Sequence, residues 1–348
     1  MKQCEARCAE ENQTRLSMLR LLCAVSVWRS GVMLILPAAG SAAWWVMLVC
    51  LLPGLGTAAL LRLTMHMTRT KSLTETVRAC LGAPGVWMVS VLLSGLLLSE
   101  ALAEMTLLMT LFTQEIGTRG TRFTMALLTG AALLLCMHRD GLPRAVHFLR
   151  WPVAAAAGVA AAYQLMQGRA DHLYPLCGEG SMTSLTAVRA GVGMAWPAVL
   201  LLTVQPACTG RLRGAVLPVF AAAAALLLLT LDVPQELMAD GRSWAGMLLP
   251  VRYAPNALGI LSLCLMMTTI FMSIAASVLY GVEMLLSPMK RCPKGLPYAV
   301  TLGLILTQAG NVTLLDGIVD DVQLWLAAGL AGVAAVCLPA ALIRRKNA

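Results

Sequence analysis

The sequence predicts an all-α integral membrane protein in which ten transmembrane helices form a 5+5 inverted repeat, with breaks in helices 1 and 6. Three observations lead to this prediction: the composition, a bias of positive charge towards alternate loops, and interruptions at matching places in two apolar spans. Hydrophobic residues make up 59% of the 348 residues and charged residues only 12%. In a soluble domain these shares are about one half and one quarter.

Ten apolar runs follow one another along the chain, and a run of about 20 residues can cross the hydrocarbon of a bilayer. They cover approximately 17–38, 42–62, 84–113, 122–138, 149–166, 185–206, 215–236, 256–286, 297–312 and 322–343. Only short loops remain between them. We therefore expect one polytopic membrane domain over 1–348, with a first half at about 17–166, a second half at about 185–343 and a cytoplasmic N-terminal tail, 1–16.

The N-terminal tail carries acidic residues at Glu5, Glu10 and Glu11 and lacks a short basic region. This pattern favours a retained first helix over a cleaved signal peptide. A second polar stretch, Lys71–Ala83, separates spans two and three. Its apolar residues recur every four positions, so it is expected to form a short amphipathic helix on the cytoplasmic surface.

Lys and Arg are concentrated in alternate loops. Eighteen of the 26 lie on the side assigned to the cytoplasm, five lie in the opposite loops and three lie within spans. Because cytoplasmic loops are rich in Lys and Arg, this bias predicts ten spans with both termini in the cytoplasm. It also explains the net charge of +9. The positive residues set the topology and contact anionic lipid headgroups, so we expect no binding of nucleic acid.

Motifs of enzymes and metal sites are missing from the sequence. The eleven cysteines form no C-x-x-C pair, the four histidines have no ligand spacing, and no phosphate-binding, zinc-protease or nucleophile-elbow motif occurs. We therefore expect no enzymatic activity, no cofactor and no metal.

The first and sixth spans are interrupted in corresponding places. Span one contains Arg29–Val32 and span six contains Arg189–Gly193, each with Arg, a small residue and then Gly-Val. Five spans per half give the halves opposite orientations, as in many secondary transporters. Interrupted helices free backbone groups that are tolerated in a membrane only where they line a polar cavity. The sequence thus predicts a binding site for a small ligand, such as an amino acid, at Arg29, Ser30, Gly31, Gly191, Gly193 and Trp196. In the alternative, the glycines only allow helices to pack closely.

The predicted spans contain ionisable side chains, among them Arg29, Glu100 and Glu104. Arg29 lies near the middle of span one, and Glu100 and Glu104 lie on one face of span three. A charge at this depth costs at least about 2.5 kcal/mol, so it normally faces protein and has a partner. We expect Arg29 to pair with Glu100, with Glu104 as the alternative. Two roles are open for this pair. It acts as a gate or as an anchor for a ligand carboxylate, or it only fixes the packing of the helices.

Several further features, taken in order, carry a resemblance to a known family. They are Ser30–Pro37, similar to G-x-G-I-L-x-L-P, the stretch Leu73–Gly82, the acidic third span, His138–Gly141, Leu173–Leu176, Pro206 before Arg211 and Arg213, and Trp244 with Val251-Arg252. Together they resemble the GerB-type spore germination permeases, a branch of the amino acid–polyamine–organocation transporter superfamily. Where family members often carry an acid after the glycines of span six, this chain has Trp196-Pro197.

The resemblance implies a leucine-transporter-like fold and the role of a germinant receptor membrane subunit. Such a subunit senses a small nutrient in the spore inner membrane, together with an A-type subunit and a C-type lipoprotein. The superfamily also implies a cation site at Thr268, Thr269 and Ser273, although such hydroxyls equally join helices. The alternative function is an amino acid permease, a secondary transporter of the same fold.

Overall fold

The computed structural model describes residues 17–31, 42–50, 52–70, 72–116, 256–288, 299–304 and 312–346, with isolated positions between them. Every regular element in these stretches is a helix. The helices are α3 (Ala43–Cys50), α4 (Leu52–Thr68), α5 (Leu73–Ile116), α13 (Asn256–Leu286) and α15 (Val312–Lys346). Residues 17–30 and 299–304 are helical as well.

Three of these helices are long and apolar enough to cross a membrane. The candidate spans are Leu73–Leu108 in α5, Leu265–Leu286 in α13 and Asp321–Arg344 in α15. The described chain is thus that of an all-α membrane protein. Apart from isolated positions, four predicted spans lie outside the described residues: 122–138, 149–166, 185–206 and 215–236. The tail 1–16 also lies outside them.

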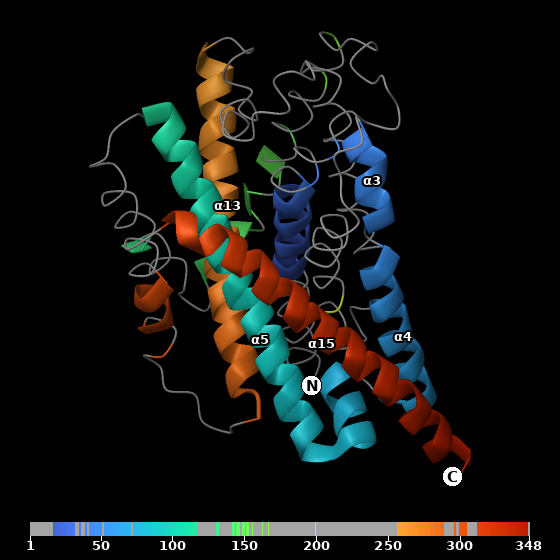
Figure 1. Ribbon diagram of the computed structural model, residues 1–348. Coiled ribbons are helices and arrows are strands. Elements are labelled where there is room, and N and C mark those ends of the chain that lie inside the picture. The colour runs from blue at the N-terminus through green and yellow to red at the C-terminus, as the bar shows by residue number, and fades with distance from the viewer. Residues whose placement is uncertain are drawn as a thin grey trace, which may run out of the picture.

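The three long helices pack against one another. In Figure 1, α15 crosses obliquely over α5 and continues past α4, while α13 runs beside α5. Small residues allow this close approach. A Cβ at Gly95 of α5 would lie 2.9 Å from a Leu326 methyl of α15, and one at Gly329 of α15 would lie 3.0 Å from a Leu92 methyl of α5. Gly95 and Gly329 thus allow α5 and α15 to pack closely.

The predicted amphipathic helix and the third predicted span form one helix, α5, with a kink. Gly82 interrupts the helical geometry with φ 72° and ψ −161°, a conformation that side chains with a Cβ rarely adopt. The segment before the kink buries Leu73 and Val77 in the protein core. Its apolar face thus packs on neighbouring helices, where the sequence had predicted contact with the membrane surface.

Two other helix boundaries differ from the prediction. The second span was expected to end at residue 62, but α4 continues to Thr68. The tenth was expected to begin at residue 322, but α15 begins at Val312 and includes Asp316, Asp320 and Asp321. Hydropathy marks only the apolar part of a helix, so polar turns beyond that part are missed. The eighth span, predicted at 256–286, coincides with α13.

The kink of α5 leaves little space around Gly85. A Cβ at this position would lie 2.4 Å from the Cβ of Leu81, which belongs to the segment before the kink. Gly85→Ala is therefore expected to lower the free energy of unfolding by about 1–3 kcal/mol, the usual cost of overpacking. Thermal unfolding of the purified protein in detergent measures this.

Gly56→Ala is the matched control, because Gly56 lies inside α4 with no atom within 4 Å of an added Cβ. Alanine is favoured over glycine in a helix by about 0.5–1 kcal/mol. This variant is expected to be as stable as the wild type or more stable. Equal unfolding temperatures for the two variants would show that the kink relaxes freely.

Candidate functional site

A buried polar network joins three helical segments at the centre of the described bundle. Arg29 comes from the helix at 17–30, Glu100 from α5 and Gln323 from α15. The Arg29 guanidinium donates from Nε to Glu100 Oε1 and from Nη2 to Glu100 Oε2, both at 3.0 Å. Gln323 completes the network, because its Oε1 accepts from Arg29 Nη2 at 3.3 Å and its Nε2 donates to Glu100 Oε2 at 2.9 Å.

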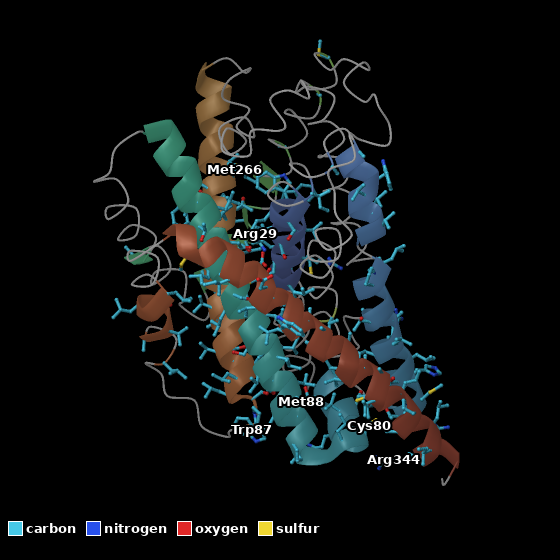
Figure 2. The ribbon with its side chains drawn as sticks, viewed as in Figure 1. Arg29, Cys80, Trp87, Met88, Met266 and Arg344 are labelled. Atoms are coloured by element: carbon cyan, nitrogen blue, oxygen red, sulfur yellow. The ribbon has the colours of Figure 1, made fainter. Side chains whose placement is uncertain are left out.

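The expected ion pair between Arg29 and Glu100 is confirmed, and it is shielded from solvent. The two side chains are 5% and 1% exposed, and Figure 2 shows Arg29 in the interior of the bundle. A two-pronged guanidinium–carboxylate contact is among the strongest and most directional hydrogen-bonded arrangements. Removal of either charge would leave the other buried without compensation. The network thus fixes the helix at 17–30 against α5 and α15.

Glu104 lies one helical turn beyond Glu100 on the same face of α5 and makes a separate contact. The Ser273 hydroxyl of α13 donates to Glu104 Oε1 at 2.6 Å. Both side chains are fully buried. Consecutive turns of α5 thus hold two carboxyl groups, one bound by Arg29 and Gln323 and the other by Ser273.

Unpartnered polar atoms accompany these contacts. In the described part of the chain, Glu104 Oε2 and the hydroxyls of Ser26, Ser30 and Ser277 are buried without a hydrogen-bond partner. They come from the helix at 17–30 and from α5, which also belong to the network, and from α13, which carries Ser273. Buried polar groups are almost always hydrogen-bonded, and an unmet group costs about 1–3 kcal/mol. Each of these oxygens has a free position for a hydrogen bond with water or with a polar ligand.

The helix at 17–30 widens next to this network. Its regular turns end at Ser30, and Gly31 and Ile35 lie in wider, π-type turns. Such turns free backbone groups and are frequent at functional sites. Ser30 and Gly31 are both buried. The predicted break of the helix stays a prediction, because Ser30 is in a regular turn and Gly31 is in a π-type turn.

The other predicted site residues are placed as follows. Gly191, Gly193 and Trp196 lie outside the described residues. In the proposed cation site, the Thr269 hydroxyl donates to the Leu265 carbonyl of its own helix at 2.7 Å, and Ser273 is bound to Glu104. Thr268 is half-buried beside them. Ser273 thus joins a buried carboxyl group, that of Glu104.

Sequence reasoning missed Gln323. A tenth span beginning at residue 322 made this glutamine look like part of a polar helix end. In the structure α15 begins at Val312, so Gln323 lies three turns inside the helix and is 2% exposed. Gln323 itself was the available signal. It is an amide at the edge of an apolar run, and a buried amide needs partners for its four hydrogen bonds.

Among the described residues, no group of His, Cys, Asp and Glu could hold a metal ion.

Comparison with known proteins does not assign the chain to a family, because no family model and no curated protein matches it.

The Glu104–Ser273 contact leads to a prediction with an internal control. Ser273→Ala leaves Glu104 Oε1 without its donor, so the free energy of unfolding is expected to fall by about 1–3 kcal/mol. Ser277→Ala removes a hydroxyl of the same helix that has no partner and is expected to change stability little. Thermal unfolding in one detergent compares the two, and equal losses would contradict a stabilising role for the contact.

Proposed function

We propose that the chain is the membrane subunit of a spore germinant receptor, which binds a small nutrient such as an amino acid and triggers germination with partner subunits. The observation that carries the proposal is the buried Arg29–Glu100–Gln323 network beside the widened turn at Gly31. The sequence resemblance supports the role of a receptor subunit.

The chemistry of the network suits a zwitterion. An amino acid carries a carboxylate and an ammonium group. A helix break presents free C=O groups at the end of its first half, which attract the ammonium group, and free N–H groups at the start of its second half, which attract the carboxylate. Ser30, at the end of the first half, adds an unpartnered hydroxyl. The unpartnered Glu104 Oε2 is an acceptor for the ammonium group. In this proposal, Arg29 and Glu100 set the shape of the site and couple its occupation to α5 and α15.

The proposed topology has ten transmembrane helices in two inverted halves, with both termini in the cytoplasm. The charge bias of the loops supports it. The proposed location is the spore inner membrane, and the proposed partners are an A-type subunit and a C-type lipoprotein. The resemblance supports both.

Affinity purification from sporulating cells tests the assembly. A tagged chain is expected to bring down a larger A-type subunit and a lipoprotein.

Reconstitution in liposomes tests the permease alternative, with uptake of labelled alanine and glycine as the readout. Isolation without partners, combined with nutrient uptake by the chain alone, would overturn the receptor proposal in favour of the permease.

A further inference from the structure

Two carboxyl groups lie in the core of the bundle on consecutive turns of α5, and one guanidinium lies with them. Glu100 is 1% exposed and Glu104 is 0% exposed. Arg29 donates to both oxygens of Glu100 at 3.0 Å, and Gln323 donates to Glu100 Oε2 at 2.9 Å. Three donated hydrogen bonds and a paired cation thus stabilise the negative charge of Glu100, and the guanidinium balances one of the two carboxyl groups.

Glu104 has a much smaller set of donors. Its Oε1 accepts a hydrogen bond from the Ser273 hydroxyl at 2.6 Å, and its Oε2 is buried without a hydrogen-bond partner. An ionised carboxylate offers about four acceptor positions, and a buried charge is costly unless it is paired and hydrogen-bonded. If both carboxyl groups were ionised, they and Arg29 together would place one net negative charge at the centre of the bundle.

The other helices packed on α5 bring uncharged side chains to this place. α13 presents Ser273, and the next titratable side chain along it is Tyr280, two turns further. α15 presents Gln323, whereas its Asp321 lies on the opposite face of that helix. Apart from Arg29, the described basic side chains of the helices at 17–30, α4 and α15 are exposed. They are Arg20, Arg62, His66 and Arg344.

We propose that Glu104 is a proton-binding site, a neutral carboxylic acid that carries its proton on Oε2 in the resting protein. Because Ser273 donates to Oε1, Oε1 is the carbonyl oxygen, and the proton is on the oxygen that has no donor. The group formed by Arg29, Glu100 and Glu104 is then neutral as a whole. The hydroxyl at Oε2 is a buried donor that is available to water or to a polar solute.

This proton can be exchanged for another cation without a change in the net charge of the site. When an ammonium group reaches Oε2, the O–H bond breaks, its electron pair stays on the oxygen, and the proton passes to water. The resulting carboxylate accepts a hydrogen bond from the ammonium group, which is a strong, charge-assisted contact. One positive charge thus replaces another beside Arg29 and Glu100.

Nutrient binding would therefore release a proton, a consequence that rests on the proposed function. Calorimetric titration of the wild type with alanine, in two buffers of different protonation enthalpy, is expected to show about one proton released per alanine bound, and the affinity is expected to fall by up to about tenfold for each pH unit of acidification. Alanine binding without proton release would contradict the exchange. No alanine binding, together with the infrared band described next, would contradict the proposed function alone.

Infrared spectroscopy of the purified full chain in detergent tests the protonation itself and requires no ligand. A neutral carboxyl group absorbs at a higher C=O stretching frequency than an ionised one. At neutral pH we expect a neutral-carboxyl band in the wild type that is missing from Glu104→Gln. Glu75→Gln is the matched control, because Glu75 is an exposed carboxyl group of the same helix, and its replacement should leave this band unchanged.

Ser273→Ala assigns the band a second time and replaces Glu104→Gln if that variant folds poorly. The C=O of Glu104 loses its donor in this variant, so the band is expected to remain and to move to higher frequency. A wild type without a neutral-carboxyl band would overturn the proposal. A band that is neither removed by Glu104→Gln nor moved by Ser273→Ala would overturn it as well.

Discussion

Arg29→Met is expected to lower the free energy of unfolding by about 3–5 kcal/mol, because it leaves the Glu100 carboxylate buried beside Gln323 without its cation. Both guanidinium bonds to Glu100 and the bond to Gln323 are lost together. A membrane protein with ordinary marginal stability would then be largely unfolded or degraded. The yield of monodisperse protein in detergent and its unfolding temperature measure the effect.

The double variant Arg29→Met with Glu100→Gln is expected to recover part of this loss. It removes the uncompensated charge, and a glutamine at position 100 retains a hydrogen bond with Gln323. Arg20→Met is the matched control, because Arg20 lies on the same helix but is exposed, and it should behave like the wild type. A double variant no more stable than the single variant would contradict the pairing as the source of the stability.

Gly31→Val is expected to abolish the response to a small nutrient while the chain still reaches the membrane at near-normal levels. Gly31 lies in the widened, buried turn directly after Ser30. A branched side chain there occupies the space in which the backbone must approach a ligand, and it disfavours the local turn. Germination of spores that carry the variant, in response to alanine, is the measurement.

Gly332→Val serves as the control for this substitution. Gly332 is an exposed glycine of α15, and no atom lies within 4 Å of an added Cβ. The same change in side chain should therefore leave the response intact. A normal response from Gly31→Val would mean that the glycine serves only helix packing.

The sequence predicted those features that follow from hydropathy and from the cost of buried charge. The span at 256–286 is α13, and Arg29 pairs with Glu100 because no isolated charge is tolerated at that depth. Both inferences needed only local composition and helical periodicity. The interruption at Ser30–Gly31, inferred from the cost of free backbone groups in an apolar medium, stays a prediction.

Features set by tertiary packing were not predictable in this way. The polar start of α15 carries three aspartates, so its true beginning, and with it the depth of Gln323, was hidden from a hydropathy criterion. The contact between Ser273 and Glu104 joins residues that are 169 positions apart, and no pattern within either span signals it. The burial of Leu73 and Val77 likewise depends on neighbouring helices that periodicity cannot identify.

Binding of small amino acids to the purified chain tests the central proposal most directly. The unfolding temperature is measured with alanine, glycine, arginine and tryptophan, for the wild type and for Gly31→Val. A ligand at 100 times its Kd stabilises the folded protein by about 2.7 kcal/mol, which is readily detected. The proposed site, flanked by Trp28, predicts that alanine or glycine raises the unfolding temperature of the wild type only, and that arginine and tryptophan do not. Equal shifts in both proteins, or no shift with either small amino acid, would contradict a nutrient site at Ser30–Gly31.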